Sequence, residues 1–83
     1  AKVPAVEQRL SAACAAQAIL LAAEACGFAG MWRTGAAAYD RALMSGLGLA
    51  ASEEIIGFLY VGSRDGAAKA IHPLDTADFV SAW

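Results

Sequence analysis

The stretch that decides the fold is residues 7–26, EQRLSAACAAQAILLAAEAC, with Gly27 directly after it. It holds no proline or glycine and is rich in Ala, Leu, Gln and Glu, which are strong helix formers. Gly27 stands where a glycine commonly ends a helix, and Pro4 stands where a first turn is expected. The sequence therefore predicts a long helix over residues 7–26.

The faces of this helix indicate how it is packed. Leu10, Cys14 and Leu21 mark one stripe, whereas Ile19 points well away from it. No side is consistently polar over residues 12–23, and a helix that is apolar all round is buried all round. Its many alanines let neighbouring backbones come close. We therefore expect a long buried helix.

Two cysteines, Cys14 and Cys26, lie on this predicted helix. At ~1.5 Å of rise per residue they are roughly 18 Å apart, whereas a disulfide needs Cα atoms within ~7 Å of each other. We expect both to be unpaired, small buried hydrophobic residues in a reducing compartment.

The next two segments predict a strand and a second helix. Residues 28–35, FAGMWRTG, form a strand-like run punctuated by glycines. Residues 36–45 have apolar side chains at fourfold spacing, which predicts a helix, and Gly46 and Gly48 would end it.

The last third of the chain predicts a strand, a turn and an arm. Residues 55–61, IIGFLYV, are β-branched and aromatic without polar alternation, which favours a central strand covered on both faces. Gly57 within it indicates a bulge or the close approach of another backbone. Residues 63–66 predict a turn, and residues 71–83 an extended C-terminal arm. Two strands cannot cover a helix on every side, so this α+β order requires further strands from elsewhere.

Composition narrows the function classes. The 83 residues include 22 alanines, 59% are apolar and the net charge is −2. Six scattered basic residues form no stripe that could neutralise phosphates, so we expect no nucleic-acid partner. The longest stretch without a charge has 14 residues, whereas a membrane-spanning helix needs ~20, and no basic segment of a signal peptide opens the sequence. We expect no membrane association and a cytoplasmic location.

The sequence shows no catalytic machinery made of side chains. Glu53 and Glu54 are the only carboxylate pair and are expected in a solvated loop. His72 is expected to be an ordinary surface histidine. Two cysteines and one histidine are too few for a usual zinc site, so no metal site is expected.

One short segment is different, because residues 31–35, MWRTG, place Trp32, Arg33 and Thr34 at a strand end before a helix. Sites in α/β-type folds are commonly built at such strand ends. An arginine there can hold a carbonyl or a phosphate, and N–H groups at the helix start can donate to an anionic ligand. The alternative is a core tryptophan beside a surface arginine.

The chain resembles a known enzyme family over nearly its whole length. Residues 22–35, AAEACGFAGMWRTG, are similar to a segment in the C-terminal half of minimal nitroreductases, which are small FMN-dependent NAD(P)H oxidoreductases. Residues 7–12, 47–49 and 54–62 agree with the same family, in order and without large gaps. The resemblance implies an α+β, nitroreductase-like fold. It also implies that residues 1–83 are the C-terminal portion of a single domain whose N-terminal half is absent.

The resemblance implies a function for the complete protein. It would transfer electrons from NAD(P)H through FMN to nitro compounds or quinones, and no catalytic side chain is needed because the flavin carries the redox chemistry. The residues that would contact FMN are Trp32, Arg33 and Thr34. Those associated with the nicotinamide nucleotide would be Ala22, Ala23, Glu24, Ala25, Cys26 and Gly27.

The resemblance also implies partners. The protein would be a homodimer with FMN at the interface, the long helix buried there, and the arm crossing to the other subunit so that Phe79 and Trp83 are covered. The N-terminal half, which in the family holds the FMN phosphate, would be the second partner. The 83-residue piece alone is expected to be inactive.

Two other interpretations stay open. One is a non-catalytic dimerisation or scaffold chain derived from the same fold, without a cofactor. The other is an unrelated alanine-rich helical interaction domain, which would have no strand over residues 55–61. Flavin absorbance would separate the enzyme from the scaffold.

Overall fold

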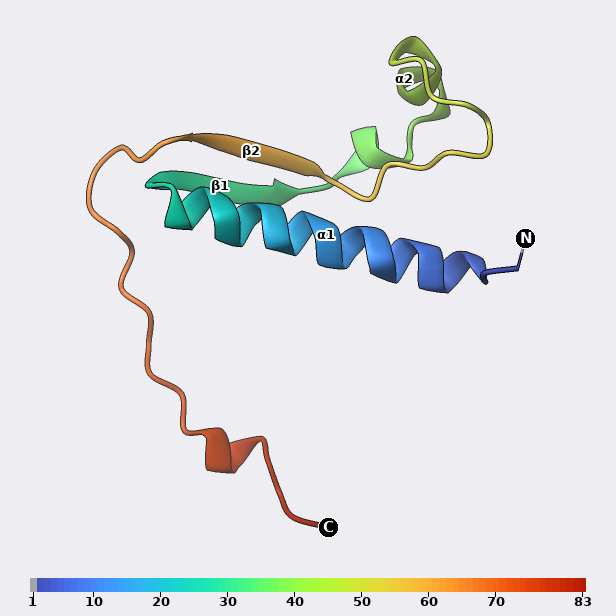
Figure 1. Cartoon of the computed structure of the whole chain (residues 1–83). Helices are drawn as coiled ribbons and strands as arrows, with labels where there is room; N and C mark the ends of the chain where they lie inside the picture. Colours follow the sequence, from blue (N-terminus) through green and yellow to red (C-terminus); the bar gives the residue numbers. More distant parts are fainter. Residues whose placement is uncertain (1) are drawn as a thin grey trace.

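The computed structural model describes residues 2–83, and its elements follow the α+β order of helix, strand, helix, strand and arm (Figure 1). In chain order they are α1 (Ala5–Ala25), β1 (Phe28–Arg33), the 3₁₀ helix η1 (Ala36–Tyr39), α2 (Arg41–Gly46), β2 (Phe58–Ser63) and the 3₁₀ helix η2 (Thr76–Asp78). The two paired strands contradict the alternative of a purely helical interaction domain.

The long helix is confirmed and begins two residues earlier than expected, at Ala5. Pro4 is its N-cap, and the Pro4 carbonyl accepts hydrogen bonds from N–H groups of the first turn at 3.0 and 3.1 Å. Cys26 is the C-cap, and Gly27 has φ +85°, a conformation that glycine adopts without steric cost. The chain therefore turns at Gly27 and returns along the helix as β1.

The sheet has two antiparallel strands in residues 2–83, with β1 and β2 paired from Phe28↔Ser63 to Arg33↔Phe58. The predicted strand over residues 55–61 is therefore displaced toward the C-terminus. Its start was wrong because β1 ends at Arg33 and presents no partner to residues 55–57. Its end was wrong because Phe28, at the start of β1, still pairs with Ser63. The predicted coverage of both faces is not found within residues 2–83, because the sheet has two strands there and the last four residues of β2 are exposed; further coverage needs a partner surface.

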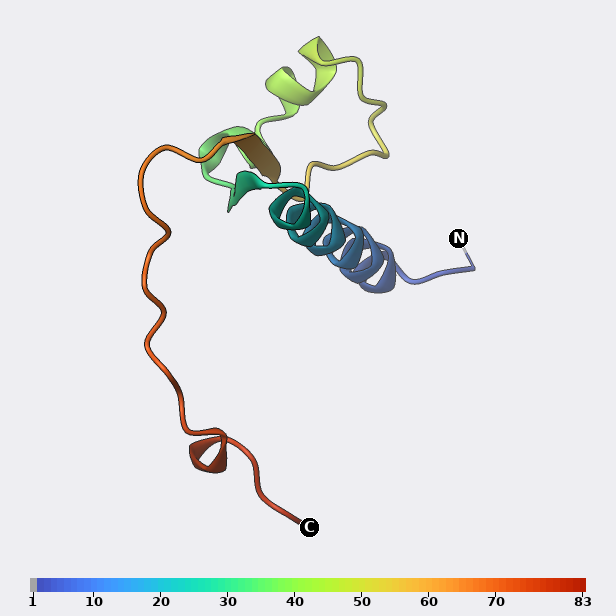
Figure 2. The ribbon, with the colours of Figure 1, turned by 60° about the vertical axis from the view of Figure 1, so that its left-hand side comes forward.

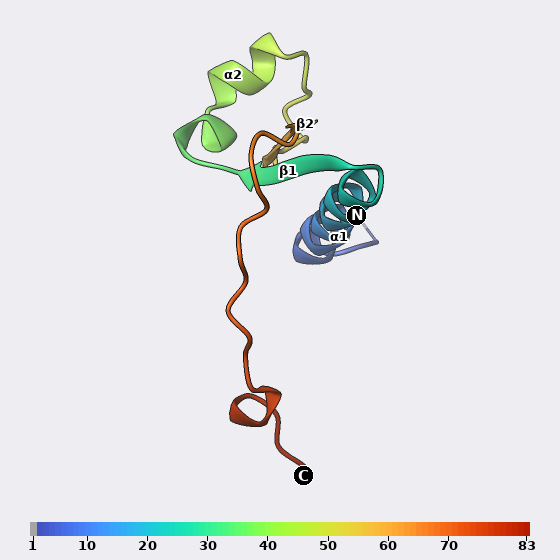
Figure 3. The same ribbon diagram turned by 90° about the vertical axis from the view of Figure 1, so that its left-hand side faces the viewer.

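Helix α1 packs along one face of this sheet (Figures 1 and 3). Ala16 is the residue of α1 that is buried. A Cβ at Gly30 of β1 would lie 2.7 Å from Cδ2 of Leu20. The glycine thus allows the helix and the strand to approach more closely than another residue would.

The second helix is not continuous, so the prediction of one helix over residues 36–45 was wrong. The chain forms η1, becomes extended at Asp40 (φ −85°, ψ 108°) and restarts as α2. The Asp40 carboxylate accepts hydrogen bonds from the N–H groups of Ala42 at 2.9 Å and Leu43 at 3.3 Å. This N-cap stabilises the restart, and a side chain that caps a helix cannot lie in the interior of another one.

The loop after α2 folds back on that helix through Arg41. Its guanidinium donates to three carbonyls of the loop, those of Glu53 at 2.8 Å, Ala51 at 3.0 Å and Ala50 at 3.3 Å. The Glu53 carboxylate also accepts from the Ala50 N–H at 2.8 Å. These bonds fix the point from which the chain leaves toward β2.

Most of the surface of α1 lies open in residues 2–83. Cys14 and Cys26 are free, as predicted, but both are exposed, so their predicted burial is wrong for this chain. The physical reason is that a two-stranded sheet covers only one side of a helix. Leu10 and Leu21 are likewise 59% and 63% exposed. Burial of the remaining sides of α1 stays a prediction that needs a partner surface.

The C-terminal arm is extended, as predicted, and runs away from the rest of the chain (Figures 1 and 2). Its only regular element in the described part of the chain is η2. It carries a set of exposed apolar side chains, namely Ile71, Leu74, Phe79, Val80 and Trp83. No helix within residues 2–83 combines the length and the apolar character that crossing a membrane requires.

Candidate functional site

Trp32 is positioned near the end of β1 and is half-buried against α1. Its indole Nε1–H donates to the carbonyl of Ile56 at 3.4 Å. A Cβ at Gly57 would lie 2.7 Å from Cδ1 of the indole, so the ring rests on a stretch of backbone that has no side chain. The close approach predicted at Gly57 is therefore made by a side chain and not by another backbone.

Arg33 and Thr34 follow Trp32 and are both exposed. The Arg33 guanidinium lies 3.7 Å from the sulfur of Met31. Within residues 2–83 it forms no ion pair, because the two pairs there belong to other arginines. Since neighbouring strand residues point to opposite faces, Arg33 and Trp32 do not face the same side. Arg33 and Thr34 therefore offer a positive charge and a hydroxyl to a ligand, while the Trp32 ring packs in the fold.

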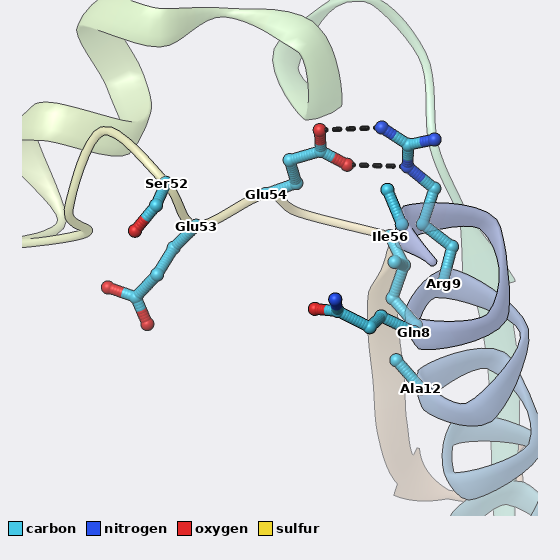
Figure 4. Close-up of a pocket in the computed structure, with 8 residues that line it drawn as sticks. Gln8, Arg9, Ala12, Ser52, Glu53, Glu54 and Ile56 are labelled. Carbon is cyan, nitrogen blue, oxygen red and sulfur yellow. Dashed lines mark hydrogen bonds and ion pairs between the residues drawn. The ribbon is translucent and has the colours of Figure 1, made fainter. Parts of the chain in front are cut away.

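An apolar hollow of about 280 Å³ lies where Trp32 meets α1. Its lining consists of small or apolar side chains, namely Ala12, Ala15, Ala16, Ile19, Trp32, Ile56, Gly57 and Leu59. A second hollow of about 310 Å³ adjoins it and shares Ala12 and Ile56 (Figure 4). Because charged and polar side chains are among its lining residues, it is called the polar hollow below. Binding sites combine an apolar wall with a few polar groups in this way.

The polar hollow contains an ion pair that sequence analysis did not find. Arg9 of α1 binds the Glu54 carboxylate with two hydrogen bonds, from Nε at 2.7 Å and from Nη2 at 2.8 Å (Figure 4). The expectation of a merely solvated loop was therefore incomplete, although Glu54 is exposed. Opposite charges were the only signal in the sequence, and 45 positions separate the two residues. Only the fold brings them together.

This contact changes the acid–base behaviour of both side chains. The hydrogen bonds from Arg9, and secondly its charge, hold the pKa of the Glu54 carboxyl below its usual range. The same contact raises the pKa of Arg9. The pair is therefore intact at neutral pH, and two parallel hydrogen bonds fix its geometry more tightly than a single contact would.

The segment expected to meet the nicotinamide nucleotide, Ala22 to Gly27, forms the last turn of α1 and the turn after it. Glu24 in this segment accepts two hydrogen bonds from Arg64, at 3.0 and 3.2 Å. Gly27 precedes the start of β1, whereas Trp32 lies near its end, about 16 Å farther along the strand. The structure brings Trp32, Arg33 and Thr34 together at one end of β1, but it does not bring them to the residues Ala22, Ala23, Glu24, Ala25, Cys26 and Gly27.

Metal-ligating side chains do not cluster in the described part of the chain. Over residues 2–83 no three side chains of His, Cys, Asp or Glu come close enough to hold an ion. His72 is exposed in the C-terminal arm.

Comparison with known proteins identifies relatives over nearly the whole chain. Residues 1–63 match the model of a family described as "Nitroreductase family". The chain is 40% identical over 81 residues to "Putative NAD(P)H nitroreductase YdjA" of Escherichia coli K12. The aligned region covers 96% of this chain and 44% of that protein. It is 37% identical over 82 residues to a "Putative NAD(P)H nitroreductase" of Haemophilus influenzae, covering 98% of this chain and 45% of that protein. The chain thus spans less than half the length of these curated relatives.

Proposed function

The chain belongs to the nitroreductase family, an oxidoreductase family, and on this premise we propose that the complete protein transfers electrons from NAD(P)H through FMN to nitro compounds or quinones. The observation that carries the proposal is the match of residues 1–63 to the family. It is supported by two relatives whose names include NAD(P)H nitroreductase. The residues of this chain contribute binding and orientation.

We place FMN at the end of β1, where the available groups suit it. The Arg33 guanidinium is exposed and has no carboxylate partner within residues 2–83, so it can hold a carbonyl or a negative charge of the cofactor. The exposed Thr34 hydroxyl can donate or accept a hydrogen bond there. The hydrogen bond of Trp32 to the Ile56 carbonyl holds the indole ring beside these two residues. When bound, FMN supplies the electron-transfer chemistry.

NAD(P)H is proposed as the co-substrate, near the last turn of α1. That turn is held by Glu24 and Arg64, and the backbone is open beside Gly27, where a Cβ would meet nothing within 4 Å. Because this region and Arg33 lie at opposite ends of β1 in one chain, the proposal requires a second surface to bring them together.

We propose two partners that would supply such a surface, a second copy of the chain and the N-terminal half of the protein. The support is the exposed apolar surface of α1 and of the C-terminal arm, since soluble single chains rarely leave contiguous apolar surface of this kind uncovered. The cytoplasm is the proposed location.

The test uses the complete protein that contains this chain. Purified protein is titrated with FMN while flavin fluorescence is recorded, and NAD(P)H oxidation is measured with a nitroaromatic compound and with a quinone. We expect Arg33→Ala to weaken FMN binding by about tenfold, the effect of losing one hydrogen bond to a charged group, and to lower the reduction potential of the bound flavin. Lys69→Ala removes an exposed positive charge between β2 and the arm and serves as the control.

Two results would contradict the proposal. A wild-type protein that is dimeric, binds no flavin and oxidises no NAD(P)H would be the non-catalytic scaffold derived from the same fold. Equal FMN affinity and equal reduction potential in the wild type and Arg33→Ala would remove Arg33 from the site.

A further inference from the structure

Residues 54–57 form an extended link between the loop held by Arg41 and the start of β2. The link lies outside the paired register, which begins at Phe58↔Arg33. Within residues 2–83 no strand pairs with it. Its position relative to α1 and β1 must therefore be set by side-chain contacts.

Two side chains hold the link, one from α1 and one from β1. Arg9 of α1 donates two hydrogen bonds to the Glu54 carboxylate, at 2.7 and 2.8 Å (Figure 4). Two residues later, the Ile56 carbonyl accepts the indole N–H of Trp32 at 3.4 Å. Gly57 then lies against the indole ring, where a Cβ would be 2.7 Å from Cδ1. The link thus connects an ion pair on α1 to the Trp32 ring.

We propose that Arg9 and Glu54 are positioning residues, which press residues 54–57 against α1 and thereby fix the orientation of the Trp32 ring. The link continues directly into Phe58, which pairs with Arg33, so the ion pair also bears on the position of Arg33. The effect on FMN rests on the proposed function, whereas the effect on Trp32 does not.

The charged surroundings favour an ionised Glu54. Arg9 faces it from α1 and Arg41 from α2, and both lower the pKa of the Glu54 carboxyl, Arg9 far more directly. Tyr39 of η1 lines a hollow together with Arg9 and Glu54. Glu53 lies beside Glu54 in the chain but its carboxylate is bound to the Ala50 N–H.

The experiment follows the Trp32 ring directly in the complete protein labelled with 5-fluorotryptophan. The fluorine resonance of Trp32 is assigned with Trp32→Phe, and spectra are recorded without flavin. We expect Arg9→Gln and Glu54→Gln each to shift the Trp32 resonance by more than its linewidth. Arg64→Gln is the matched control, because it breaks the other ion pair of the described chain at the far end of β1 and should leave the resonance in place.

A charge reversal tests whether the ion pair itself is responsible. The double variant Arg9→Glu/Glu54→Arg should return the resonance toward the wild-type position, whereas the shifts caused by Arg9→Glu and by Glu54→Arg alone would add in the double variant if the two residues acted independently. Circular dichroism of every variant separates a local reorientation from unfolding. Trp32 resonances unchanged in both single variants would overturn the proposal.

The pH dependence has a definite direction. Since the pKa of Glu54 is lowered in the folded protein, the ion pair is present above the usual carboxyl range and is lost only as the pH falls through the lowered value. The wild-type Trp32 resonance should shift in that acidic window, and Glu54→Gln should show no such transition. A transition of equal size in Glu54→Gln would contradict the proposal.

FMN affinity separates this inference from the proposed function. If the Trp32 resonance moves in Glu54→Gln and FMN binding weakens several-fold, both are supported. If the resonance moves while FMN affinity stays the same, the positioning of Trp32 is supported and its effect on flavin binding is contradicted, whereas the flavin site itself is tested by Arg33→Ala.

Discussion

At the scale of single residues, Trp32 and Gly57 show how one side chain can organise a region without a continuous strand. The indole ring occupies the space that a side chain at position 57 would need. Its N–H donates to the neighbouring carbonyl of Ile56, which gives a half-buried polar group a partner. The sequence indicated a close approach at Gly57, but it could not identify the approaching group, because Trp32 lies 25 positions earlier.

Gly57→Ala should therefore be destabilising. The new Cβ would meet Cδ1 of Trp32 at 2.7 Å and Cε2 at 3.0 Å, so the ring must move. Overpacking of this kind costs about 1–3 kcal/mol. We expect a lower free energy of unfolding in urea, together with a shifted Trp32 fluorine resonance. Gly62→Ala is the control, because a Cβ there meets nothing within 4 Å, and equal stability losses for both variants would refute the steric explanation.

At the scale of elements, the helical segment of residues 36–46 is interrupted at Asp40. This interruption shows which features the local sequence specifies and which it does not. The apolar spacing of residues 36–45 is helical throughout, yet the structure has η1, an extended residue and then α2. Aspartate is a strong N-cap and a poor interior residue, so its presence was a signal for a helix start. Residue spacing alone cannot decide between an interior aspartate and a cap.

Asp40→Ala should weaken α2. It removes the acceptor for the N–H groups of Ala42 and Leu43, and a lost N-cap costs about 0.5–2 kcal/mol. We expect a lower midpoint of thermal unfolding, measured by circular dichroism. Asp75→Ala is the matched control, since Asp75 caps η2 in the extended arm by accepting from the Ala77 N–H. A larger loss for Asp75→Ala than for Asp40→Ala would show that the arm contributes more to stability than α2.

At the scale of the whole molecule, the described chain is open and buries few apolar side chains. Its radius of gyration is 17.0 Å, whereas a compact domain of this length has one of about 12 Å. Among residues 2–83, three hydrophobic residues are buried, namely Ala16, Ala38 and Met44. Most apolar side chains are therefore not buried within residues 2–83. A partner would bury the most apolar surface on the open sides of α1.

Leu21→Glu tests the proposed covering of α1 by a second subunit. Leu21 is 63% exposed in the chain and lies on the apolar surface of the helix. A charge buried there without a partner is unfavourable, so we expect the complete protein to sediment as a dimer and the variant to dissociate to a monomer. Ala51→Glu, on an exposed loop position, should remain dimeric. A Leu21→Glu protein that stays dimeric but unfolds at a lower temperature would place Leu21 against the N-terminal half instead.

The sequence by itself determined the features that depend on neighbouring residues. The long helix, its end before Gly27, the α+β order and the unpaired cysteines follow from short stretches in which propensity and spacing agree. The family followed from a resemblance over nearly the whole chain, which the family match confirms. It also singled out Trp32, Arg33 and Thr34, whose role as an FMN site stays a proposal.

Tertiary structure alone decided the contacts between distant positions. Arg9 meets Glu54 across 45 positions, Glu24 meets Arg64 across 40, and the paired length of β2 is set by where β1 begins and ends. The physical reason is that a surface ion pair or a strand register leaves almost no trace in local composition, because many charged or apolar residues could occupy those positions. Only the path of the chain, with α1 folded back along β1, selects the partners that meet.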